Sequence, residues 1–210
     1  MNSLIDDLQW RYSVKKYNPA KKISQADFDI LKQVLSLVPT SNGLQPYKFL
    51  IIEDPEIRKQ LREKSFNQSQ ITDASHLIVM CAYNTLSEND IDGFMNLNAS
   101  VREVSLESLI PYREHLHRSL LKRTDYEHLR SNEKQCYIAL GQLIQAAALL
   151  RIDSTPMEGF LPAGYNEVLN LSEQNLNATV VCALGYRAEE DPFQHMRKVR
   201  KQHLSIFEII

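Results

Sequence analysis

The segment PTSNGLQPYKFLII, residues 39–52, joins a stretch of helical periodicity to an apolar run. Two small hydroxyl residues, an Asn-Gly pair and a Gln-Pro pair come before that run begins. A connection between two elements of secondary structure needs only a few residues and one turn signal. So many polar side chains and turn-forming residues in one connection indicate a loop that contacts a ligand.

Apolar patterns on both sides of this loop predict many helices and few strands. Residues 3–10 are predicted as a helix, Ser24 can cap a second helix with Asp27 three residues on, and Asp54 followed by Pro55 starts a third. Buried strands are predicted at YKFLIIED (residues 47–54), SHLIVMCAY (75–83) and NATVVCALGY (177–186). Elements in this mixed order indicate an α+β fold.

The second half of the chain contains two different helical regions. Residues 87–130 are polar and helix-prone with an interruption near Pro111, which predicts a solvated helical hairpin. Residues 132–151 are apolar almost all round, with a narrow polar stripe at Gln135, Gln142 and Gln145. Such a helix belongs in the centre of a fold or at a helix–helix interface. The apolar end of residues 196–210 also needs a cover, such as a second subunit.

The bulk composition excludes several classes of function. The chain has 210 residues, 43% hydrophobic and 24% charged, with a net charge of −2, as in an ordinary globular protein without nucleic-acid or membrane partners. The N-terminus carries Asp6 and Asp7 instead of a signal pattern, which predicts a cytoplasmic location. The three cysteines lie in apolar runs and are predicted to be buried reduced thiols: Cys81, Cys136 and Cys182.

Motifs for several common chemistries are absent from the sequence. No G-x-G-x-x-G follows a strand and no phosphate-binding P-loop is present, so neither nucleotide fold is predicted. His115 and His117 are two positions apart and would lie on different sides of a helix. No metal site is therefore expected from them.

Three further polar clusters accompany the loop. In RYSVK, residues 11–15, Arg11 could hold an anion such as a phosphate with help from Ser13, although taken alone these cations more often complement a helix dipole. RKVRK, residues 197–201, is a second basic cluster or a solvated basic turn. In TPMEGF, residues 155–160, proline and glycine permit an irregular backbone with amides for a ligand, or a plain connecting loop.

The order and content of these clusters resemble the FMN-dependent nitroreductase family, most closely its oxygen-insensitive NAD(P)H nitroreductase and flavin reductase branch. The resemblance is carried by RYSVKKYNPAKKIS, VPTSNGLQPYKFLII, FNQSQITDASHLIVMCA, TPMEGFLP and VVCALGYRAEEDPFQHMRKVRK. It spans nearly the whole chain and implies a single FMN-binding domain over residues 1–210. The implied fold is α+β, with a central, mainly antiparallel sheet surrounded by helices in an intertwined homodimer.

The resemblance implies that both basic clusters hold one FMN. Arg11, Tyr12 and Ser13 would lie along the phosphate and ribityl chain, and Lys15 would approach the N1/C2=O edge of the ring. Lys198 and Arg200 would complete a phosphate clamp. An FMN phosphate carries about two negative charges and binds well to fixed Arg or Lys donors.

The resemblance also explains the polar loop before the first strand. In the family this segment crosses to the flavin of the partner subunit, and the residues implied there are Pro39, Thr40, Ser41, Asn42 and Gln45. The usual family order is Gly then Asn, whereas this chain has Asn42 then Gly43. Which of the two makes the usual asparagine contact is therefore left open.

Two further segments are implied at the flavin ring. Asn67 matches the asparagine at the polar edge of the ring, and Gln70 stands where close relatives often carry a lysine, which suggests a lower flavin potential. The loop beside flavin N5 comprises Pro156, Met157, Glu158 and Gly159. The amides of its last two residues would bond near N5 and O4, so no side chain need act as a catalytic acid or base.

The implied reaction is ping-pong hydride transfer. NAD(P)H would reduce the bound FMN, and a nitroaromatic, a quinone or a free flavin would then take its place, beneath a lid from about residues 112–126. Two alternatives are a specialised reductase of the dehalogenase or enal/aldehyde type, and a flavin-binding dimer without NAD(P)H turnover. The lid residues would distinguish the first alternative, and NAD(P)H oxidation the second.

Overall fold

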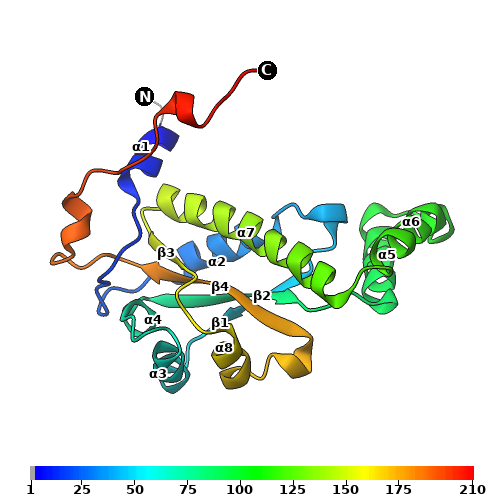
Figure 1. The fold of residues 1–210 in the computed structure, drawn as a ribbon, viewed down its shortest axis with the longest axis horizontal. Coiled ribbons are helices and arrows are strands. Elements are labelled where there is room, and N and C mark those ends of the chain that lie inside the picture. Colours follow the sequence, from blue (N-terminus) through cyan, green and yellow to red (C-terminus); the bar gives the residue numbers. More distant parts are fainter. Residues whose placement is uncertain (1–2) are drawn as a thin grey trace.

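A computed structural model describes residues 3–210, which fold around a four-stranded sheet in the order β1-β2-β4-β3 (Figure 1). The strands are β1 (Tyr47–Ile51), β2 (His76–Tyr83), β3 (Asp153–Met157) and β4 (Leu176–Gly185). Each neighbouring pair of strands is antiparallel. The predicted α+β class with a central antiparallel sheet is confirmed.

The central and the edge strands differ in how well they were predicted. The central strands β2 and β4 are buried at nearly every position, as the apolar runs predict. The prediction of a buried strand over residues 47–54 is wrong in part, because β1 ends at Ile51 and lies at an edge with only Tyr47 fully buried. The prediction of an irregular segment over residues 155–160 is also wrong in part, because β3 extends to Met157. Its Pro156 is tolerated because an edge strand leaves one row of amides unpaired.

Eight α-helices are present in the described part of the chain. They are α1 (Ser3–Trp10), α2 (Gln25–Ser36), α3 (Pro55–Glu63), α4 (Gln70–Asp73), α5 (Glu88–Arg102), α6 (Ile110–Leu120), α7 (Asp125–Leu149) and α8 (Pro162–Val168). The predicted caps are confirmed, since the Ser24 side chain accepts a hydrogen bond from the amide of Asp27 and Asp54 accepts from the amides of Glu56 and Ile57. Such signals act locally and can be found without the fold.

The helices cover both faces of the sheet (Figure 1). Helices α2 and α7 pack on one face, against Ile78 and Met80 of β2, while α3, α4 and α8 pack on the other, against Val79 and Cys81. This division follows from the alternation of side chains along a strand. The cysteines are free and buried, as predicted, and burial raises the pKa of each thiol to about 12.

Helix α7 is longer than predicted and is buried along one side only. Its opposite side keeps three apolar residues on the surface, Tyr137, Ile138 and Leu149, which are 41%, 43% and 51% exposed. An apolar strip on a central helix is typical of a surface that another chain covers. Among the described helices, none is long and apolar enough to cross a bilayer.

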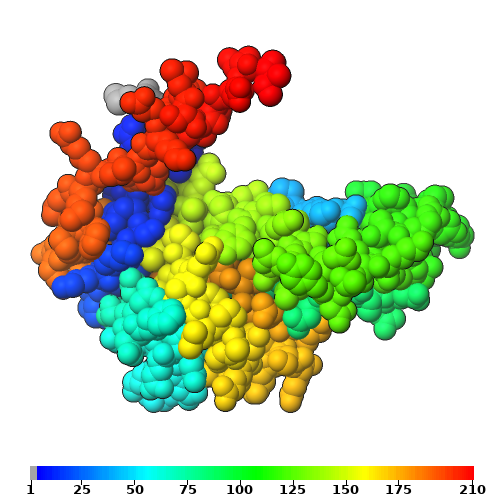
Figure 2. All heavy atoms as spheres, viewed as in Figure 1, coloured from blue at the N-terminus to red at the C-terminus, as the bar shows by residue number. Residues whose placement is uncertain are grey.

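The ends of the molecule are formed by a hairpin and by the C-terminal segment (Figure 2). Helices α5 and α6 form the predicted hairpin, which protrudes at one end around Ile91, Met95 and Leu116. Pro111 lies in the first turn of α6 and interrupts no helix, because a missing amide proton costs nothing there. Residues 196–210 pass α1 at the other end, and Ile209 is fully exposed.

Candidate functional site

The two basic clusters meet beside the end of α1. The ammonium of Lys198 donates hydrogen bonds to the main-chain carbonyl oxygens of Gln9, at 2.6 Å, and of Arg11. The Nε and Nη2 atoms of Arg11 are buried and have no hydrogen-bond partner among the described residues. Burial, followed by the charge of Arg200, lowers the pKa of Arg11, and burial followed by the charges of Arg11 and Arg200 lowers the pKa of Lys198. Among residues 3–210, no ion pair joins Arg11, Lys198 or Arg200 to a carboxylate.

The segment over residues 11–17 belongs to no helix or regular strand, and side chains of distant residues satisfy several of its main-chain groups. The buried carboxylate of Asp191 accepts hydrogen bonds from the amides of Lys15, at 2.7 Å, and Lys16, at 3.0 Å. The Thr155 hydroxyl of β3 donates to the carbonyl oxygen of Val14 at 2.9 Å. Tyr12, Ser13 and the exposed Lys15 thus follow Arg11 along the edge of β3.

Asp191 was missed by the sequence analysis. Burial alone would raise the pKa of this carboxyl, but hydrogen bonds from the amides of Lys16, Lys15 and Phe193 outweigh it and lower the pKa below its ordinary value. An irregular segment needs partners for its amides, so the need for such a group is foreseeable. No local pattern in the sequence shows which acid supplies it.

The segments around residues 67–70 and 156–159 adjoin one another. The Nε2 atom of Gln68 donates to the carbonyl oxygen of Gly159 at 2.7 Å, and a Cβ atom at Gly159 would lie only 3.0 Å from this Nε2. Asn67 adopts a left-handed backbone with φ of 58° at the surface, whereas Gln70 is buried in α4. Both predicted ring contacts therefore lie beside the loop predicted at flavin N5.

The carboxylate of Glu158 is engaged by α7. The Tyr137 hydroxyl donates to its Oε1 atom at 2.5 Å, and burial followed by this carboxylate raises the pKa of Tyr137. The main-chain amides of Glu158 and Gly159 donate to no acceptor within residues 3–210. This loop, which follows Pro156 and Met157 of β3, therefore offers two amides that a ligand could occupy.

The loop over residues 39–45 lies in a different part of the structure from the Arg11 cluster. The amide of Ser41 donates to Oε1 of Gln135 in the first half of α7 at 2.9 Å, and the Tyr112 hydroxyl donates to the carbonyl oxygen of Asn42 at 3.0 Å. At the other end of α7, Arg151 pairs with Asp7 of α1, so the segment that leads to Arg11 lies near the C-terminal end of α7. Since a helix rises about 1.5 Å per residue, residues 135 and 149 are about 21 Å apart. Pro39, Thr40, Ser41, Asn42 and Gln45 thus lie away from the Arg11 cluster of the same chain (Figure 1).

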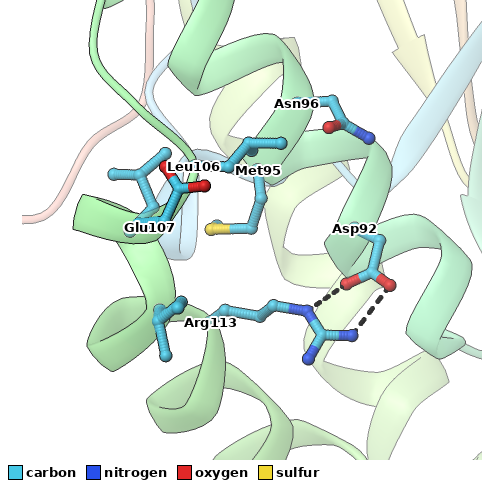
Figure 3. A pocket seen from close by; sticks show the side chains of 8 residues that line it. Asp92, Met95, Asn96, Leu106, Glu107 and Arg113 are labelled. Atoms are coloured by element: carbon cyan, nitrogen blue, oxygen red, sulfur yellow. Dashed lines mark hydrogen bonds and ion pairs between the residues drawn. The ribbon is translucent and has the colours of Figure 1, made fainter.

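A hollow of about 290 Å³ lies within the α5–α6 hairpin (Figure 3). Its lining combines apolar residues such as Met95 and Leu106 with the polar groups of Asn96 and Glu107. The Arg113 guanidinium donates to both carboxylate oxygens of Asp92, at 2.5 and 2.8 Å, and joins the two helices there. None of the flavin contacts expected from the sequence lines this hollow.

Comparisons with known proteins show the family of the chain. The model of the Nitroreductase family matches residues 8–186, so the chain belongs to that family. It is 32% identical over 209 residues to a Staphylococcus epidermidis protein whose name assigns it to the NAD(P)H nitroreductases, with 93% of each chain covered.

Solved structures show the same fold at lower identity. The Bacillus subtilis protein YdfN, which is described as a nitroreductase, has a TM-score of 0.88 at 14% identity, with 99% of each chain covered. An Exiguobacterium sibiricum protein, described as a nitroreductase in complex with FMN, has a TM-score of 0.81 at 18% identity, with 100% of this chain and 98% of that chain covered. The fold of this chain is therefore nitroreductase-like.

Proposed function

We propose that this chain is an FMN-dependent NAD(P)H oxidoreductase that reduces nitroaromatics, quinones or flavins. The observation that carries the proposal is the half-buried guanidinium of Arg11, whose buried Nε and Nη2 atoms have no partner among residues 3–210 and which lies beside Lys198 and Arg200. Buried cations of this kind are compensated by an anion, and a phosphate with about two negative charges suits a planar guanidinium. The family, the relatives named for NAD(P)H and the FMN bound by a protein of the same fold support it.

The chain's own residues would divide the work between binding and orientation. Arg11, Lys198 and Arg200 would hold the phosphate, Lys15 and Asn67 would hold the polar edge of the ring, and the amides of residues 158 and 159 would meet N5 and O4. Bound FMN would supply the hydride-transfer chemistry, so that NAD(P)H and the acceptor use one pocket in turn. No side chain is required to move a proton.

We further propose that the full chain forms one domain and that two copies form an intertwined homodimer. The apolar strip of Tyr137, Ile138 and Leu149 and the uncovered C-terminal apolar residues support this assembly. The distance between the loop over residues 39–45 and the Arg11 cluster supports it as well, since each loop could then complete the flavin site of the other copy. A symmetric dimer would contain two such sites.

Purified protein tests the proposed function directly. We expect a yellow protein whose flavin absorbance is bleached by NADH or NADPH without oxygen and is restored by a quinone or a nitrofuran. Colour without bleaching would contradict the oxidoreductase and leave a flavin-binding dimer. Protein that takes up no FMN would contradict both.

A further inference from the structure

Arg187, two residues beyond β4, is fixed on a buried carboxylate. Its guanidinium contacts Asp153, with 2.6 Å from Nη2 to Oδ1 and 3.0 Å from Nε to Oδ2, and its amide donates to Oδ2 at 2.8 Å. Asp153 is the first residue of β3 and is only 2% exposed. Main chain and side chain of Arg187 are thus held by one group, in the planar bidentate geometry that lysine cannot reproduce.

Two aromatic rings lie against this guanidinium. Its central carbon is 4.4 Å from the ring centre of Trp10 and 4.5 Å from that of Tyr12. The ring of Trp10 also lies 5.0 Å from the guanidinium carbon of Arg151. Contacts between a cation and an aromatic ring contribute about 0.5–2 kcal/mol each, with the larger values for desolvated pairs.

The two rings belong to the residues immediately before and after Arg11. Arg187 therefore holds the chain on both sides of Arg11, while two nitrogen atoms of the Arg11 guanidinium have no partner among residues 3–210. The charge of Arg187 is already compensated by Asp153, which distinguishes it from the three cations of the cluster. The charge of Arg187 ranks behind burial, Arg11 and Arg200 in lowering the pKa of Lys198, so its main contribution is to geometry. A ligand benefits from donors that are ordered before it binds.

We propose that Arg187 is a positioning residue for the phosphate clamp. Arg187 orders Arg11 through the rings of Trp10 and Tyr12 and does not itself contact the phosphate. This inference rests on the proposed flavin function. Because Arg187 would act only through the clamp, its removal should weaken the binding of the flavin phosphate. Binding of the flavin ring should not change.

The experiment compares two flavins that differ only in the phosphate. Apoprotein is titrated with FMN and with riboflavin, and each dissociation constant is measured by flavin fluorescence. For Arg187→Gln we expect FMN to bind about tenfold more weakly, while the riboflavin constant stays within about twofold. Arg187→Lys should weaken FMN binding as well, because an ammonium cannot hold Asp153 in bidentate fashion between two rings.

A matched control is the cation–ring contact of Tyr186, the residue before Arg187. Lys21 lies 4.1 Å from the ring centre of Tyr186, and within residues 3–210 no hydrogen bond, ion pair or cation–ring contact joins either residue to Trp10, Arg11 or Tyr12. Lys21→Gln removes a comparable cation–ring contact and should leave both dissociation constants unchanged.

Several results would overturn the positioning role. These are equal weakening of both flavins in Arg187→Gln, unchanged FMN binding in that variant, or full FMN affinity in Arg187→Lys. Wild-type protein that binds neither flavin would instead contradict the proposed function itself. Thermal melting of each apoprotein shows whether a variant is folded before it is titrated.

Discussion

The ammonium of Lys198 donates a hydrogen bond to the main-chain carbonyl of Arg11, although the two residues are 187 positions apart in the chain. This contact brings the basic C-terminal cluster onto the basic segment after α1. It places positive charges beside the Arg11 guanidinium, two nitrogen atoms of which have no partner in the described part of the chain. Like charges approach in this way at a cost, which a bound anion removes.

Arg11→Gln should weaken FMN binding by about tenfold to a hundredfold, because hydrogen bonds between charged groups contribute about 1.5–3 kcal/mol. Fluorescence titration of apoprotein measures the change. Lys201→Gln, which removes an exposed cation of the same basic run, serves as the control and should bind FMN normally. Normal FMN affinity in Arg11→Gln would rule out a phosphate site at this position.

Gln70→Lys should raise the midpoint potential of the bound flavin, because an added cation near N1 stabilises the anionic reduced ring. Redox titration of the holoprotein measures the potential. Gln60→Lys adds the same charge on the exposed side of α3 and should have little effect. No shift, or a downward shift, in Gln70→Lys would refute the hypothesis for this position.

Asp191 should make the folded state sensitive to acid. Its pKa is lower in the folded chain than the value of about 3.9 expected in the unfolded chain, so its contribution to stability is complete above that value. The contribution is lost as the pH falls through the folded pKa, because the folded state must then take up a proton.

Asp191→Asn should therefore lower the free energy of unfolding by about 1–3 kcal/mol at pH 7. The difference from wild type should narrow below about pH 4. Urea unfolding at a series of pH values measures both quantities. A difference that stays constant down to pH 3 would show that the Asp191 carboxylate is not the group responsible.

Asp92→Asn should loosen the α5–α6 hairpin without unfolding the sheet. The hydrogen bonds from Arg113 lower the pKa of Asp92, so the ion pair is present at neutral pH and is lost in acid (Figure 3). Hydrogen exchange of the amides in α5 and α6 should become faster, while exchange in β2 and β4 stays unchanged.

The control for this variant is Glu114→Gln, which removes an exposed pair with Arg118 within α6. Such a pair contributes little, so hydrogen exchange should be close to that of wild type. Faster exchange throughout Asp92→Asn would mean that the pair supports the whole fold.

The features that the sequence predicts well are those with local causes. Ser24 and Asp54 mark helix starts through partners two or three residues away, and the apolar runs of β2 and β4 identify central strands. Strand β3 was not predicted, because it is short, contains Pro156 and depends on pairing with β4. Its extended form is a consequence of a neighbour that is remote in sequence.

The same distinction applies to the candidate site. The cations of both basic clusters are visible in the sequence, but their meeting requires the fold. The sequence analysis missed two groups that fix the segment around Arg11, namely Asp191, which accepts from the amides of Lys15 and Lys16, and Arg187, which contacts the rings of Trp10 and Tyr12. Each acts on residues more than 170 positions away. The family resemblance already implied that the loop over residues 39–45 serves another subunit, and the fold shows that this loop lies away from Arg11 of the same chain.

The central claim is that each flavin site takes its phosphate clamp from one copy and its polar loop from another, and subunit complementation tests it most directly. Arg11→Gln removes the clamp, and Ser41→Trp places a large side chain at an exposed loop position that would reach into the partner's site. We expect each variant alone to bind little FMN.

Equal amounts of the two variants are then unfolded and refolded together. Half of the dimers should be mixed, and each mixed dimer should contain one intact site out of two. About a quarter of the wild-type FMN binding should therefore return. No recovery on mixing, or normal FMN binding by Ser41→Trp alone, would contradict a site shared between two chains.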